Sequence, residues 1–133
     1  MIELPAPKYY CLIERKVVMT TDLMQWAMWF ELARRSGASA IGKDDVSNAF
    51  VSTTFLGIDH NYWGGAPLLF ETMVFAQEED GSSDMFQERY ATIEEAEAGH
   101  KRVVASLRKH ETDAIEMAST FLYIIRKEAF AKG

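Results

Sequence analysis

The sequence predicts an α+β domain: an antiparallel sheet of three to five strands with two or three helices packed on one face. Three observations lead to this prediction. The chain has 133 residues, a length typical of one domain. Segments that alternate like strands surround a segment with helical spacing, and a long second stretch with helical spacing follows them. We therefore treat residues 1–133 as a single domain.

The first third is predicted as a strand, a turn and a helix. Residues 9–13 alternate like a strand that can fold back at Arg15-Lys16 into residues 17–19. Thr20-Thr21-Asp22 provides capping side chains for a helix that should end near Ser36-Gly37. The apolar residues of this helix share one face: Leu23, Trp26, Ala27, Phe30 and Ala33.

The middle third is predicted to be strands joined by loops. A loop of small residues should lead into a strand over residues 46–58, rich in Val, Thr and Phe. A second strand is expected over residues 68–76, and a turn over residues 79–83 should join it to residues 85–91 as a hairpin.

The last third is predicted to be helical. Thr92 and Glu95 have the spacing of a capping box. The residues that share the apolar face of the helix are Ile93, Ala96, His100, Val103 and Leu107, and the pattern returns at Ala114, Ala118, Phe121 and Ile125. Asp113 could cap a separate helix, so the pattern leaves open whether residues 92–131 form one helix or two.

Charge and composition narrow the functional classes. The formal net charge of -6 argues against direct binding to nucleic acid. The single cysteine, Cys11, excludes an intramolecular disulfide and fits a small core residue. No apolar run is long enough to span a membrane, and the first residues lack the features of a signal peptide. We therefore expect a cytoplasmic protein.

The acidity is concentrated in the middle of the chain. Residues 67–100 carry nine acidic side chains and one basic one, whereas residues 101–133 carry seven basic and four acidic ones. Solvated surface charge and helix capping explain part of this pattern. The alternative is an acidic partner-binding surface made of Glu78, Glu79, Asp80 and Asp84.

Four segments combine into a recognisable pattern. They are FLGIDHN at residues 55–61, PLLFETMVF at 67–75, ERYAT at 88–92 followed by Glu94, Glu95, Ala96 and His100, and WAMWFE at 26–31. This pattern resembles a family of small uncharacterised proteins encoded by bacteriophages and prophages. The resemblance covers roughly residues 22–105 and implies a protein that acts inside a bacterial host cell, with no activity attached.

One loop has the composition of a ligand clamp. Asp59, His60 and Asn61 precede Tyr62, Trp63 and two glycines, so rings to stack and polar groups to orient a ligand occur together. The structural alternative is an Asp/Asn turn with Trp63 folded onto the core.

Three further residues could carry chemistry. Glu71 interrupts an apolar strand, either as the buried partner of Arg89 or as a general base facing a pocket. His100, on the apolar face of its helix, is more typical of a hydrogen-bonded core residue. Together with Asp59 and His60, Glu71 and His100 would offer zinc or manganese two imidazoles and two carboxylates.

These observations favour a phage or prophage accessory protein that binds a host protein, with counter-defence as one form, or binds a small ligand such as a nucleotide. The predicted ligand-binding residues are Asp59, His60, Asn61, Tyr62, Trp63, Glu71, Arg89 and His100. The alternative is a small metal-dependent hydrolase using His60, Glu71 and His100. A homodimer is a third hypothesis, with a contact through Trp26, Trp29 and Phe30 or through residues 121–125.

Overall fold

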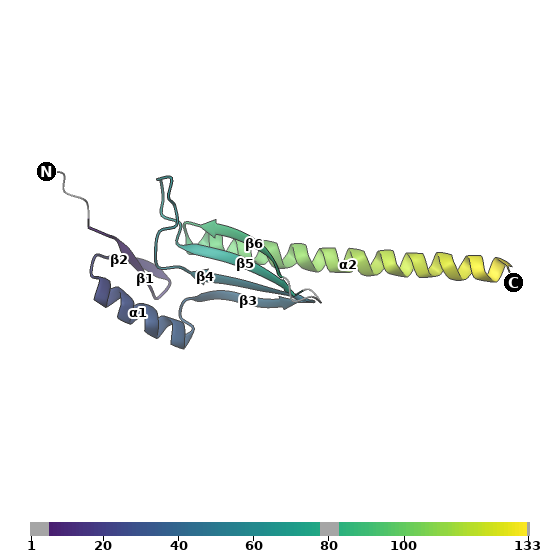
Figure 1. The fold of residues 1–133 in the computed structure, drawn as a ribbon, viewed down its shortest axis with the longest axis horizontal. Helices are drawn as coiled ribbons and strands as arrows, with labels where there is room; N and C mark the ends of the chain where they lie inside the picture. The colour runs from purple at the N-terminus through teal and green to yellow at the C-terminus, as the bar shows by residue number, and fades with distance from the viewer. Residues whose placement is uncertain (1–5, 78–82, 133) are drawn as a thin grey trace.

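The computed structural model describes residues 6–77 and 83–132. The elements in chain order are β1 (Tyr9–Ile13), β2 (Lys16–Thr20), α1 (Leu23–Ser36), β3 (Ala40–Val46), β4 (Ala49–Phe55), β5 (Phe70–Gln77), β6 (Ser83–Tyr90) and α2 (Ile93–Lys132). Figure 1 shows a sheet lying along one half of α2, with α1 and the first two strands at the end of the sheet and the other half of α2 projecting away. The predicted α+β class is confirmed.

The N-terminal hairpin and α1 form one packing unit. β1 and β2 pair antiparallel around Glu14 and Arg15, whose positive φ angles of 49° and 67° fit a tight two-residue turn. Trp26 of α1 donates from Nε1 to the carbonyl oxygen of Tyr10 at 3.0 Å. The predicted boundaries of α1 are confirmed: Asp22 caps its start, and Gly37 ends it with a φ of 79°.

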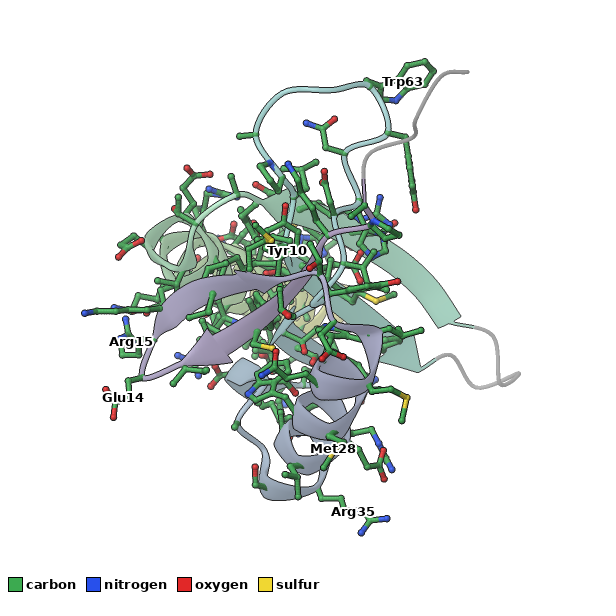
Figure 2. All side chains as sticks on the ribbon, turned by 90° about the vertical axis from the view of Figure 1, so that its left-hand side faces the viewer. Tyr10, Glu14, Arg15, Met28, Arg35 and Trp63 are labelled. Carbon is green, nitrogen blue, oxygen red and sulfur yellow. The ribbon has the colours of Figure 1, made fainter. Side chains whose placement is uncertain are left out.

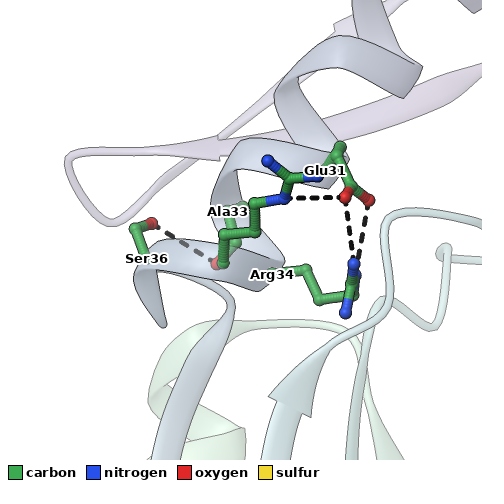
Figure 3. Close-up of polar contacts among 5 residues, drawn as sticks. Glu31, Ala33, Arg34 and Ser36 are labelled. Atoms are coloured by element: carbon green, nitrogen blue, oxygen red, sulfur yellow. Dashed lines mark hydrogen bonds and ion pairs between the residues drawn. The ribbon is translucent and has the colours of Figure 1, made fainter.

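The outer side of α1 faces solvent. Met28 and Arg35 point away from the body of the protein (Figure 2). Glu31 accepts from both Arg34 and Arg35 at 2.9 Å, and Ser36 donates to the carbonyl oxygen of Ala33 (Figure 3). The hydrogen bond from Arg34 lowers the pKa of Glu31. The two ion pairs of Glu31 are exposed, so they contribute little to stability.

The main sheet is antiparallel with the order β3-β4-β5-β6. The predicted antiparallel pairing of β5 with β6 is confirmed, and most of the turn predicted over residues 79–83 lies outside the described residues. The prediction for residues 37–58 is wrong in part. The expected loop contains β3, and the expected strand is β4 preceded by a turn at Ser47 and Asn48. The sequence did not predict β3 because it contains Lys43, Asp44 and Asp45, and lysine and aspartate are uncommon in strands. An edge strand can carry such polar side chains.

α2 is one continuous helix, which answers the question that the pattern left open. Asp113 accepts from Lys109 Nζ at 3.0 Å, one turn earlier in the same helix, and does not cap a new one. Thr92 accepts from the backbone N–H of Glu95 at 3.2 Å, as the predicted cap requires. None of the helices in the described ranges is long and apolar enough to cross a membrane.

The core lies between the sheet and the first turns of α2, in two clusters. The cluster near the start of α2 contains Leu12, Phe55, Leu69, Phe70, Tyr90, Ile93 and Ala96. The cluster further along contains Val46, Val51, Val74, Val103 and Val104. Cys11 is buried, as predicted, and burial raises the pKa of its thiol. Burial of apolar side chains on one face of α2 therefore attaches this helix to the sheet.

Candidate functional site

A chain of hydrogen-bonded side chains crosses the interface between the sheet and α2. His100 of α2 contacts Asp44 Oδ2 of β3 through Nε2 and Thr53 Oγ1 of β4 through Nδ1, both at 2.7 Å. Thr53 Oγ1 lies 2.5 Å from Thr72 Oγ1 of β5, directly opposite in the strand register. Tyr90 of β6 donates to Thr72 Oγ1 at 3.1 Å. All four strands of the main sheet are thus linked to one helical residue.

The hydrogen bonds of this series of side chains can all donate in one direction, from Tyr90 towards Asp44. If His100 is neutral with its proton on Nε2, it donates to Asp44 and its Nδ1 accepts from Thr53. Thr72 then donates to Thr53 and accepts from Tyr90. This assignment gives each donor an acceptor, as buried polar groups require. Burial raises the pKa of Tyr90, in keeping with a neutral phenol as donor.

Two glycines leave room for this series of hydrogen-bonded side chains. A Cβ atom added at Gly42 of β3 would lie 2.9 Å from the His100 ring, and one added at Gly99 of α2 would lie 2.2 Å from the Tyr90 hydroxyl oxygen. A larger residue at either position would force the His100 or Tyr90 side chain to move. Glycine is therefore required here for close approach.

Asp44, His100 and Thr53 have the order of an acid–histidine–hydroxyl triad, but the burial of the Thr53 hydroxyl excludes its attack on a substrate. The exposed fraction of Thr53 is 0%, and that of Thr72 is also 0%. The Thr53 hydroxyl also has Thr72 as a second partner, and a nucleophile must reach the reacting atom. The arrangement positions α2 on the sheet and satisfies its buried polar groups.

The sequence favours a hydrogen-bonded core role for His100 and also places this residue among the ligand-binding candidates, but it does not indicate its hydrogen-bond partners. Asp44 lies in a stretch that the sequence predicts as a loop, and Thr53 and Thr72 are ordinary strand residues by composition. Tyr90, Gly42 and Gly99 gave no signal of their own. The available clue was that polar Thr residues occupy inward positions of two strands.

Glu71 and Arg89 form the predicted pair. Arg89 donates from Nε to Glu71 Oε2 at 2.9 Å, Gln87 donates to the same oxygen, and the Glu71 side chain is only 8% exposed. Side chains alternate along β5, and Thr72 faces α2, so Glu71 lies on the opposite face of the sheet. The pair joins β5 to β6 on the face of the sheet opposite α2.

The predicted metal set does not form. Glu71 and His100 lie on opposite faces of the sheet, and Asp59 and His60 lie in a loop whose carboxylate serves the loop backbone. Across residues 6–77 and 83–132, no group of three or more His, Cys, Asp or Glu side chains is arranged to hold a metal ion. The sequence misled here because spacing along the chain does not show which face of a sheet a residue occupies.

The loop of residues 59–68, which we call the tip loop, holds its own backbone in place. Asp59 Oδ1 accepts from the N–H groups of Asn61 at 2.8 Å and Leu68 at 2.9 Å, so it joins the two ends of the loop. Asn61 donates to the carbonyl oxygen of Ala66 at 2.9 Å and accepts from the N–H of Trp63 at 3.3 Å. The groups predicted to orient a ligand therefore close an Asx-type turn.

The aromatic residues of the tip loop face outwards. Trp63 is 97% exposed and Tyr62 is 77% exposed, and Figure 2 shows Trp63 at the end of a loop that stands away from the sheet. The alternative that Trp63 folds onto the core is wrong. His60 is half-buried. Its ring lies 6.2 Å from that of Tyr62, and its buried Nδ1 has no hydrogen-bond partner among the residues that the structure describes.

The acidic segment is partly used within the fold. Glu88 pairs with Arg102 of α2, and Glu97 pairs with Arg15 of the β1–β2 turn. Three of the residues predicted to bind a partner, Glu78, Glu79 and Asp80, lie outside the described residues. The fourth, Asp84, belongs to β6, where its backbone is opposite Ala76. The acidic partner surface therefore stays a prediction.

Comparison of the chain with protein-family models, curated proteins and solved structures finds no match.

Proposed function

We propose that this protein is a phage or prophage accessory protein that acts by binding a host protein, and that the tip loop is its docking element. The single observation that carries the proposal is the near-complete exposure of Trp63 on a loop with a fixed backbone. Tryptophan is enriched among the residues that dominate binding energy at protein interfaces.

The fixed backbone favours a protein partner. Asp59 and Asn61 order the tip loop before any partner arrives, so binding loses less conformational entropy. A small polar ligand would need those same oxygens and amides, which the loop already uses. An apolar pocket on a partner needs only the rings of Tyr62 and Trp63. The bacterial setting rests on the sequence resemblance.

The experiment is site-specific photocrosslinking in the bacterium that carries the gene. A benzophenone amino acid replaces Trp63 in one variant and Met28, which is 66% exposed on α1, in the control. We expect one discrete adduct with a host protein from position 63 and none from position 28. In a third variant, with the crosslinker at Tyr62, the added change Trp63→Ala should remove the adduct. Adducts that are the same at both positions, or none at position 63, would contradict the proposal.

A further inference from the structure

The β1–β2 hairpin has one strand edge that the fold uses and one that is open. The outer edge of β1 is used: the N–H of Tyr10 donates to the carbonyl oxygen of Gly57 at 2.9 Å, and its carbonyl oxygen accepts from Trp26 Nε1 at 3.0 Å. β2 pairs only with β1, and within the residues that the structure describes its backbone has no hydrogen-bond partner beyond β1. Figure 2 shows the hairpin at the front of this end of the molecule, with Glu14 and Arg15 at its turn.

The geometry of the hairpin shows which backbone groups face the open edge. A two-residue turn makes its flanking residues, Ile13 and Lys16, a hydrogen-bonded pair, and hydrogen-bonded and non-hydrogen-bonded pairs then alternate along the ladder. Tyr10 and Met19 are therefore a pair whose N–H and C=O groups point away from each other. The outward bonds of Tyr10 agree with this assignment. By the same alternation, Val17 and Met19 turn their N–H and C=O groups towards the open edge.

The side chains of β2 leave this edge apolar and regular. Val17, Val18 and Met19 are 41%, 44% and 51% exposed. β2 contains no proline, its pairing with β1 has no register shift, and its one charged residue, Lys16, lies at the turn end. The edge strand β3, by contrast, has a register shift near its start and three consecutive charged residues. Proteins protect strand edges with such features, and an apolar edge without them is a template for another strand.

β2 is complementary to itself in one register. A two-fold axis through Val18, perpendicular to the hairpin, keeps the faces of the two hairpins aligned and places Val18 opposite Val18 and Val17 opposite Met19. Both outward-facing residues of each copy then form hydrogen-bonded pairs, and every directly opposed pair among them is apolar. Registers centred on Val17 or on Met19 pair only one of the two outward residues within the strands.

The charges near the ends of β2 are compatible with this register. Lys16 lies opposite Thr20 of the second copy, so no two like charges are opposed within the strands. Asp22 of the second copy continues along the same face, one diagonal step from Lys16, where opposite charges attract. Further charged residues near the two ends have mixed signs: Lys8, Glu14 and Arg15.

We propose that β2 pairs antiparallel with β2 of a second copy of this chain, with Val18 opposite Val18. The two hairpins then form one sheet in the order β1-β2-β2-β1. What the open edge recognises is an extended backbone with apolar side chains, and a second copy offers both in register. The pairing is independent of the tip loop, which connects β4 to β5.

The first test is the mass of the full chain in solution over a range of concentrations, by sedimentation or native mass spectrometry. We expect twice the 15.1 kDa of one chain at high concentration. Val18→Lys and Val18→Glu should each give a monomer, because like charges then face each other, and an equimolar mixture of the two should restore a dimer. A wild-type monomer at every concentration, a dimer in either variant alone, or a mixture that stays monomeric overturns the proposal.

A matched control changes another exposed apolar residue. Leu32 is 65% exposed on α1, so Leu32→Lys and Leu32→Glu should leave the dimer intact. Loss of the dimer in these variants would place the contact on α1 and overturn the proposal. Circular dichroism checks that all variants retain the fold.

The second test reads the register from disulfides and needs no charged variant. In a Cys11→Ala background, Val18→Cys should give a disulfide-linked dimer, because opposed residues of a non-hydrogen-bonded pair have Cα atoms about 4.5 Å apart. Lys16→Cys should not link to itself, since the two copies of residue 16 lie roughly 14 Å apart along the strands. It should link to Thr20→Cys when the two chains are mixed. A chain with Val18→Cys that stays monomeric under oxidation, or one with Lys16→Cys that links to itself, overturns the proposal.

Discussion

Residues 93–107 of α2, the covered segment, and residues 108–128, the projecting segment, share one helical pattern but have different surroundings. In the covered segment, Ile93, Ala96 and Val103 are buried against the sheet. In the projecting segment, Ala114 and Ile125 continue the same spacing into solvent. The period of apolar residues therefore determines which face of a helix is apolar. The rest of the molecule determines what that face contacts.

The polar groups of the two segments differ in the same way. His100 of the covered segment connects α2 to β3 and β4 through buried hydrogen bonds. The projecting segment has surface contacts such as Lys109 with Asp113. Stability within one chain should thus be concentrated in the covered segment, because surface ion pairs contribute little. Four predictions follow this contrast, from the largest effect to the smallest.

The two histidines of α2 give the sharpest comparison. His100→Ala leaves the buried Thr53 hydroxyl without its partner on α2 and creates a cavity, so we expect the free energy of unfolding to fall by about 2–4 kcal/mol. His110→Ala, at an exposed position of the projecting segment, should change it by less than about 0.5 kcal/mol. Urea unfolding measures both. Equal effects would mean that the His100 contacts do not attach α2 to the sheet.

Gly99 tests the close approach of α2 to the sheet. Gly99→Ala places a Cβ atom against the Tyr90 hydroxyl. We expect a loss of about 1–3 kcal/mol from overpacking, although alanine favours the helix by up to about 1 kcal/mol. Adding Tyr90→Phe removes the clashing oxygen and should recover part of the loss. No recovery in the double variant would place the strain on the ring carbons of residue 90, two of which lie 2.4 and 2.5 Å from the same Cβ position.

Tyr90 also predicts a pH dependence. Burial raises its pKa above the ordinary value of 10.0. The unfolded chain therefore loses this proton first, and the stability from the neutral phenol is lost as pH rises from about 10 through the folded-state pKa. Tyr90→Phe should flatten the decline in stability above pH 10, measured by urea unfolding at several pH values. Tyr123→Phe, at an exposed position of the projecting segment, is the control and should leave the slope unchanged.

The smallest effect is expected at the surface pair of the projecting segment. Lys109→Ala removes the contact with Asp113 and should lower stability by about 0.3 kcal/mol at low salt. The difference should vanish at high salt because the pair is exposed. A loss above 1 kcal/mol would show that this segment is packed more tightly than a surface helix.

Most of the elements were predictable from local patterns. The N-terminal hairpin, the limits of α1, the β5–β6 hairpin and the cap at Thr92 all follow from turn and capping residues near the element ends. β3 was missed because its polar residues are supported by partners far away in the sequence. Asp44, for example, meets His100 of α2, 56 residues later.

The candidate site was predicted less completely. The Glu71–Arg89 pair was predictable because adjacent strands of a hairpin place opposite charges side by side. The composition of the tip loop was recognised, but the exposure of Trp63 was not. An aromatic residue beside glycines has the same sequence signature whether it packs inwards or points outwards.

The sequence by itself determined the class of fold, the positions of most turns and caps, and the apolar face of α2, because these depend on residues within a few positions of each other. Only the tertiary structure decided that Glu71 and His100 lie on opposite faces of the sheet, that Thr53 and Thr72 join His100 in one buried chain, and that the sheet covers only the first part of α2. These features depend on strand register and on where the sheet ends, and both are set by packing between distant segments.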